Sequence, residues 1–197
     1  MTLSLIKRLE AHSARCWPAQ YVDALAGWEI RRTPDVPSGR INSVTPVNPV
    51  AGKFNEVLLR ARALFAEMDE WPLIRITPLA GEDTIDHLRA WGLQGEGHTL
   101  VKTVTLSEHH LADHDHTSLM SEVHPALATA WMTVYAEAHD SDEAARLALT
   151  KRLNAIGIEQ AYIVIYDGAE PVAVGRAAKD GDIIGLFQIA TRPHWRR

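Results

Sequence analysis

The sequence predicts an α/β (α+β) fold in which a mixed, mostly antiparallel sheet is flanked by helices, and three observations support this prediction. Residues 53–69 place apolar side chains at intervals of three and four, as an amphipathic helix does. Residues 162–191 contain apolar, β-branched runs separated by Asp-Gly pairs, which is typical of strands joined by hairpin turns. The 197 residues are 46% hydrophobic, enough to form a core in one large domain or two small ones.

Composition and charge argue against several classes of protein. The formal net charge of -5 provides no basic field for a nucleic-acid backbone, and no apolar run is long enough to span a bilayer. Residues 1–17 lack the apolar core of a secretory signal peptide. Because Cys16 is the single cysteine, no internal disulfide forms, and we expect a reducing, cytoplasmic environment.

The first 106 residues alternate predicted helices and strands. The predicted helices are Leu3–Arg15, the periodic segment 53–69, and 82–91. Pro18 follows the first of these helices closely, and Gly92 ends the third. The predicted strands are 27–33 and 39–46, which pair with each other, 73–77 between two prolines, and 95–106, which alternates along its whole length.

Residues 107–122 form a predicted linker that is rich in histidine and aspartate. Imidazole and carboxylate groups can bind zinc or nickel. Here they are crowded along one polar segment, without a helix or strand spacing that would make them converge: His109, His110, Asp113, His114, Asp115 and His116. We therefore expect a solvated linker and no metal site.

The remaining residues predict two helices followed by three strands. The first helix follows Pro125 and includes Trp131, and the second ends at Gly157 after a capping box formed by Asp140 and Glu143. The strands are 162–166, 171–178 and 183–191, separated by the turns Asp167-Gly168 and Asp180-Gly181.

This order, in which the last strand runs into proline and arginine, resembles the GCN5-related N-acetyltransferase family. In that family the fourth strand leads into Arg/Gln-x-x-Gly-x-Gly/Ala, a loop at a helix start whose amides hold the pyrophosphate of acetyl-CoA. The resemblance sets Ile189, Ala190 and Thr191 against the pantetheine and acetyl groups, and Arg196 at the first motif position with Arg197 next. The two glycines do not follow within the 197 residues, so the resemblance implies a truncated motif. Alternatively, both arginines are solvated at a chain end.

Residues 73–106 resemble the closing third of the same fold, with two departures. Leu88 stands where the family often has a tyrosine that returns a proton to the CoA thiolate, and Gly52 stands alone where a glycine-rich loop is expected. The resemblance therefore implies a degenerate first domain, 1–106, a linker, 107–122, and the N-terminal portion of a second domain, 123–197.

The resemblance also implies direct acyl transfer from acetyl-CoA, used as a co-substrate. A primary amine must lose a proton before it attacks the thioester, and a backbone amide near Ile189 or Ala190 would stabilise the oxyanion. Glu137 or His139, at the end of the helix that follows Pro125, would position or deprotonate the amine. Alternatively, these two residues are ordinary helix surface and cap.

Three functional hypotheses follow. The first is an N-acetyltransferase acting on the primary amine of a small molecule or peptide, truncated here and therefore weak in binding acetyl-CoA. The second is a non-catalytic module that binds a ligand or partner. The third, compatible with both, is a homodimer formed through the exposed strand Ile183–Ala190.

Overall fold

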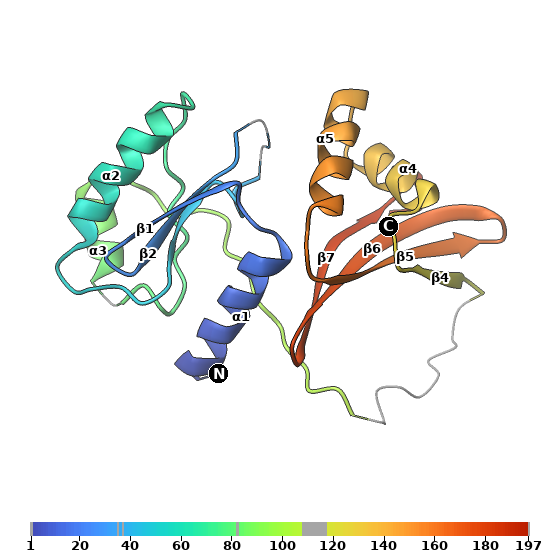
Figure 1. Ribbon diagram of the computed structural model, residues 1–197, viewed down its shortest axis with the longest axis horizontal. Helices are drawn as coiled ribbons and strands as arrows, with labels where there is room; N and C mark the ends of the chain where they lie inside the picture. The colour runs from blue at the N-terminus through green and yellow to red at the C-terminus, as the bar shows by residue number, and fades with distance from the viewer. Residues whose placement is uncertain (1, 35, 37, 82, 108–117, 197) are drawn as a thin grey trace.

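The computed structural model describes residues 2–34, 36, 38–81, 83–107 and 118–196. It is an α+β protein with two antiparallel sheets flanked by helices, which confirms the predicted fold class (Figure 1). The helices are α1 (Leu3–Cys16), α2 (Phe54–Ala66), α3 (Thr84–Ala90), α4 (Thr129–Ala138) and α5 (Glu143–Asn154), and a 3-10 turn spans Pro193–Trp195. The strands are β1 (Tyr21–Leu25), β2 (Trp28–Arg32), β3 (Ser43–Pro46), β4 (Met120–His124), β5 (Glu159–Asp167), β6 (Glu170–Asp180) and β7 (Ile183–Thr191).

The first sheet has the order β1-β2-β3 and packs against helix α2. Its buried residues Trp28, Ile30 and Val44 share a core with the periodic face of α2, which includes Val57 and Phe65. The apolar period predicted a helix over 53–69, and the helix observed at Phe54–Ala66 confirms it. Helix α3 also agrees with its prediction, because Gly92 follows it at φ +75° and donates its N–H to the carbonyl of Arg89.

The predicted strands of the first half are only partly correct. Strand β1 was not predicted, because its pattern of exposed and half-buried residues shows no buried face. The predicted strand 39–46 is limited to β3, and the predicted strand 73–77 contributes one parallel bridge, between Ile74 and Val44.

The prediction of a long strand over 95–106 is wrong. This segment has no regular secondary structure and is exposed, with Leu100 at 70% and Val104 at 66% relative exposure. Alternation marks residues that suit a strand, but a strand also needs a neighbour to supply ladder hydrogen bonds. No neighbouring strand pairs with this segment in the described part of the chain.

The second sheet has the order β4-β5-β6-β7 and contains all three predicted strands of the second half. The turn glycines Gly168 and Gly181 have φ of +57° and +61°, as the Asp-Gly pairs predicted. Strand β4 was not predicted, and it begins inside the segment assigned to the linker. The histidine-rich residues 108–117 lie outside the described residues, and the predicted domain boundaries stay predictions.

One face of the second sheet carries a second hydrophobic core. Helices α4 and α5 cover this face, and two residues from the first half, Trp17 and Ile41, are buried in the same core. The core also contains Trp131, Met132, Val134, Leu153, Ile156, Tyr162, Val164, Val174 and Ala190. Helix α1 contacts β6 and β7, so the first helix of the chain packs against its last two strands (Figure 1). None of the helices in the described ranges combines the length and apolar character needed to cross a bilayer.

The C-terminal end of α1 is held by arginines from both halves. Carbonyl oxygens at a helix C-terminus carry partial negative charge and attract cations. Here Arg31 of β2 donates to the carbonyl of Ala14 at 3.2 Å, Arg176 of β6 donates to that of Cys16 at 2.9 Å, and Arg152 of α5 donates to that of Pro18. Ion pairs also connect α1 to both halves. Arg8 pairs with Asp182 of the second half at 2.6 Å, and Arg15 pairs with Asp180. Glu10 pairs with Arg75 of the first half at 3.0 Å.

A buried histidine of helix α1 predicts a pH-dependent stability. His12 is 3% exposed, and its Nδ1 has no hydrogen-bond partner among the described atoms. Burial lowers the pKa of the imidazole, an effect that Arg15 increases and Asp180 opposes. The unfolded chain therefore binds a proton that the folded chain excludes. The contribution of His12 to the free energy of unfolding is fully present above about pH 6.5. It is lost as the pH falls from there toward the lowered pKa that His12 has in the folded protein.

We expect the free energy of unfolding to decrease between pH 7 and pH 5 in urea titrations. The variant His12→Phe keeps a ring beside Phe187, whose centroid lies 6.4 Å away, but cannot titrate. Its stability should decrease less over the same range. An equal decrease in both proteins would contradict the assignment to His12.

Candidate functional site

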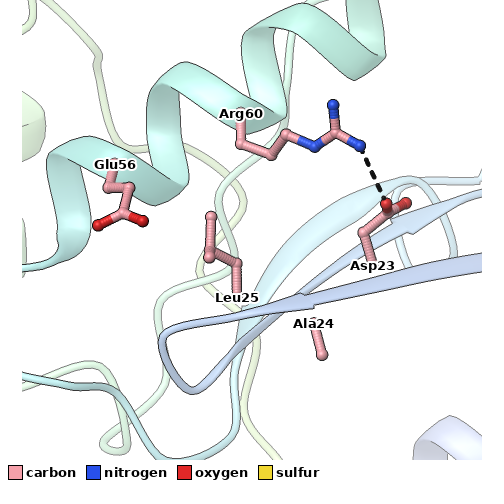
Figure 2. A pocket seen from close by; sticks show the side chains of 5 residues that line it. All are labelled: Asp23, Ala24, Leu25, Glu56 and Arg60. Carbon is pink, nitrogen blue, oxygen red and sulfur yellow. Dashed lines mark hydrogen bonds and ion pairs between the residues drawn. The ribbon is translucent and has the colours of Figure 1, made fainter.

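One hollow on the described surface lies between β1 and α2. It has a volume of about 450 Å³ and is lined by Asp23, Ala24, Leu25, Glu56 and Arg60 (Figure 2). Arg60 reaches from α2 to Asp23 of β1, with Nη2 3.4 Å from Oδ1, and Glu56 pairs with Lys53 at 3.1 Å. Each charged lining side chain already has an ion-pair partner, so this hollow offers no unpaired charge to a ligand.

Another hollow lies where the end of α4 meets the end of β7. We call it the β7 pocket; it has a volume of about 430 Å³ and is lined by Ala138, His139, Ile189, Ala190, Thr191 and Arg196. The structure thus brings together His139, predicted on the acceptor side, with four residues predicted on the cofactor side. Glu137 is not among the lining residues, and Arg197 lies outside the described part of the chain.

The end of α4 positions His139 at the pocket. Asp140 has φ +50°, and the N–H groups of Asp140 and Ser141 donate to the carbonyls of Glu137 at 3.4 Å and Ala136 at 2.9 Å. This bond pattern ends the helix sharply and leaves His139 as its C-cap. The prediction that Asp140 caps the second helix is wrong, because Asp140 lies at the end of α4. The N-cap of α5 is Asp142, whose side chain accepts the N–H of Ala145 at 2.8 Å.

A column of aromatic rings connects His139 to the core. Its imidazole lies 4.4 Å from the ring of Tyr135, which stacks on Trp131 at 5.0 Å and 8°. Trp131 meets Tyr162 edge-on, at 5.5 Å and 86°. Burial raises the pKa of the Tyr135 phenol, so Tyr135 is neutral at physiological pH. The column therefore holds the imidazole through apolar contacts, with no charge beside it in the column.

A β-bulge shapes the other wall of the pocket. Val174 of β6 faces Ala190 of β7, but Arg176 faces Phe187, so β7 carries one extra residue opposite Gly175. Gln188 in this bulge has φ +44°, a left-handed conformation. A bulge interrupts the ladder and redirects the strand. Here it includes Gln188, the residue before Ile189, which lines the pocket.

The neighbours of the bulge compensate for the interrupted ladder. The indole Nε1–H of Trp131 donates to the carbonyl of Gly175 at 2.8 Å. A side chain at Gly175 would lie against Ile189, since a Cβ there would be 3.7 Å from its Cγ1. The aromatic column and the bulge are therefore joined at one hydrogen bond.

Glu137 takes part in an ion pair beside the pocket. Its Oε2 lies 2.9 Å from Nε of Arg192, and its Oε1 lies 3.3 Å from Nη2 of the same residue. Arg192 also donates to Glu170 at 2.7 Å. Both carboxylate oxygens of Glu137 are thus engaged, and the pair ties α4 to the end of β7.

Arg196 joins the two walls of the pocket. Its Nε–H donates to the carbonyl of Thr191 at 2.8 Å, and its Nη2–H donates to the carbonyl of Ala138 at 2.7 Å. These bonds use some of the guanidinium donors on the backbone and leave the others for an anion.

The one cysteine is not placed for chemistry. Cys16 is fully buried, and burial raises the pKa of its thiol to about 11. A protonated, inaccessible thiol is a poor nucleophile. In the described ranges, no group of three or more His, Cys, Asp or Glu side chains could hold a metal ion.

Four important residues at the site were missed by the sequence analysis. Gly175 and Arg176 carried usable signals: glycine inside a strand often faces a bulge, and an arginine on the inward face of β6 breaks an apolar alternation. Gln188 and Arg192 carried none, because their roles depend on the register of β7 and on residues distant in the sequence.

Comparison with known proteins gives fold information alone. No protein-family model matches the sequence, and no curated protein matches it. Among solved structures, the chain is similar to the crystal structure of a functionally unknown conserved protein from Staphylococcus epidermidis ATCC 12228. The TM-score is 0.53 at 9% identity, and the match covers 91% of this chain and 74% of that one.

Proposed function

We propose that this chain belongs to an N-acetyltransferase that transfers an acetyl group from acetyl-CoA to the primary amine of a small molecule or peptide. The observation that carries the proposal is the β7 pocket, where a bulged strand end and a helix end converge around His139 and Ile189. The proposal includes a reducing, cytoplasmic environment, consistent with Cys16 as a single free thiol.

In this proposal, the pantetheine arm lies along Ile189, Ala190 and Thr191, and Arg196 faces the pyrophosphate. The amine nitrogen attacks the thioester carbon, its proton passes to a base, and the CoA thiolate leaves when the tetrahedral intermediate collapses. His139 lines the pocket and is our proposed base, since imidazole accepts protons near neutral pH. The amide of Ile189 or Ala190, redirected by the bulge, stabilises the oxyanion.

The proposal predicts weak but specific binding of acetyl-CoA. The two glycines of the pyrophosphate loop are not among the 197 residues, so we expect a Kd above the micromolar range. Amide NMR signals of Ile189 to Thr191 should shift in millimolar acetyl-CoA. Thiol release from acetyl-CoA should depend on an added primary amine, and His139→Gln should decrease it by about 10²-fold or more while amide shifts persist. Absence of both shifts and thiol release across a panel of amines would overturn the proposal.

A non-catalytic binding module is the second candidate, and the Glu137–Arg192 pair favours it. Because both carboxylate oxygens of Glu137 are engaged, this residue is not free to accept a proton from an amine. The second candidate predicts acetyl-CoA shifts at the β7 pocket without amine-dependent thiol release.

We further propose that the chain forms a homodimer through β7. This strand is at one edge of the four-stranded sheet, and it exposes Ile184 and Leu186 at 51% and 67%. An open apolar edge pairs readily with another copy.

Light scattering should report a dimer that Leu186→Lys converts to a monomer, because a lysine on an edge strand disfavours pairing. The matched control is Leu147→Lys on α5, where the leucine is similarly exposed at 62%. Wild-type protein that is monomeric at high concentration would contradict the dimer.

A further inference from the structure

Arg176, on the inward face of β6, is a buried cation that the proposed chemistry does not use. It is completely buried, yet no carboxylate forms an ion pair with it within the described ranges. Its guanidinium lies close to two rings, with Cζ 5.7 Å from the centroid of Trp17 and 5.0 Å from that of Phe187. A buried charge without a counter-ion is costly unless its donors are satisfied, so its hydrogen bonds indicate what it holds in place.

Three hydrogen bonds from Arg176 lead to three different elements. Nε–H donates to Oε1 of Gln188 in the bulge at 2.7 Å, and Nη1–H donates to Oε1 of Gln160 in β5 at 2.6 Å. Nη2–H donates to the carbonyl of Cys16, at the end of α1, at 2.9 Å. The planar guanidinium fixes the directions of these bonds relative to one another.

Gln160 extends this connection to a second helix end. Its Nε2–H₂ group lies 3.2 Å from the carbonyl of Leu153 and 3.4 Å from that of Ile156, at the end of α5. One cation therefore joins the C-terminal ends of α1 and α5 to the bulge that forms a wall of the β7 pocket.

The bulge needs such a restraint. Gln188 has φ +44°, a region that residues with a side chain rarely occupy. A conformation of this kind persists where its surroundings fix it. The hydrogen bond from Arg176 is the contact that fixes the Gln188 side chain.

We propose that Arg176 is a positioning residue for the β7 pocket: by holding Gln188 it sets the bulge, and through Cys16 it makes helix α1 part of the scaffold of the pocket. The inference rests on the proposed function insofar as acetyl-CoA is taken as the ligand. The coupling between Arg176 and the bulge stands independently of that ligand.

The test compares two glutamines that accept from the same guanidinium. Gln188→Met removes the acceptor in the bulge, Gln160→Met removes the acceptor in β5, and Gln188→Glu keeps an acceptor at the bulge. For each folded variant, hydrogen exchange is measured at the amides of Ile189 and Ala190, together with global stability and the NMR titration with acetyl-CoA.

We expect Gln188→Met to accelerate exchange at these amides and to weaken acetyl-CoA binding, each by about tenfold, the effect of losing one charge-assisted hydrogen bond. Gln188→Glu should restore both. Gln160→Met should lower global stability but leave both local readouts near wild type. Equal effects of Gln188→Met and Gln160→Met on the two amides would overturn the inference. If wild-type protein does not bind acetyl-CoA, the proposed function fails, and the exchange data still decide the role of Arg176.

Discussion

Replacing Trp131 with alanine should cause the largest loss of stability of any single substitution considered. Trp131 is completely buried between Tyr135 and Tyr162, and its indole satisfies the carbonyl of Gly175. The cavity costs about 3–5 kcal/mol, and the carbonyl left without its donor adds about 1–3 kcal/mol. Because a domain is stable by only about 5–15 kcal/mol, Trp131→Ala should be largely unfolded or marginally stable at 37 °C.

Thermal and urea unfolding of Trp131→Ala and Trp131→Phe measure this loss. Trp131→Phe keeps an aromatic ring but not the indole donor, so its loss should be smaller and should reflect mainly the Gly175 carbonyl. For a chain of this size, each 1 kcal/mol corresponds to a shift in Tm of about 2–4 °C. A loss below about 1 kcal/mol for Trp131→Ala would show that the column does not support the core.

Gly27→Ala should destabilise the first sheet through a backbone clash. Gly27 follows β1 at φ +77°, and a Cβ at this position would lie 1.8 Å from the carbonyl oxygen of Asn48. The same loop is fixed by the N–H groups of Val47 and Asn48, which donate to the carbonyl of Gly27 at 2.9 and 2.8 Å. The backbone cannot yield without breaking these bonds, so we expect a loss of about 3 kcal/mol or more.

Gly52→Ala is the matched control for this clash. Gly52 has φ +71°, but a Cβ there would meet nothing within 4 Å. The control therefore reports the conformational strain alone, on the order of 1 kcal/mol. Equal losses for the two variants, measured by urea unfolding, would show that the contact with Asn48 is relieved at little cost.

Much of the fold could be predicted because its signals are local. The period of α2, the left-handed Gly92 after α3, and the Asp-Gly turns at Gly168 and Gly181 each depend on a few adjacent residues. Strand pairing is not local. Nothing within 95–106 indicates whether another strand will pair with it, and β1 buries no face that would mark it.

The candidate site also combines residues that the sequence could indicate with contacts that it could not. The resemblance drew attention to His139 and to Ile189–Thr191, which line one pocket, although their roles stay predictions. The pairing of Glu137 with Arg192 joins a helix end to residues after the last strand, so no local pattern could indicate it. The restraint on Gln188 by Arg176 depends on the register between β6 and β7, which a single extra residue changes.

The packing of helix α1 against strands β6 and β7 has a consequence for synthesis on the ribosome. The helix is translated well before the strands that it packs against. Translation proceeds at about 5–20 residues per second, so roughly 10–35 s separate the synthesis of α1 from that of the end of β7. During that interval its apolar side is exposed to chaperones and to other nascent chains. Helix α1 therefore acquires these contacts only after β6 and β7 have been translated.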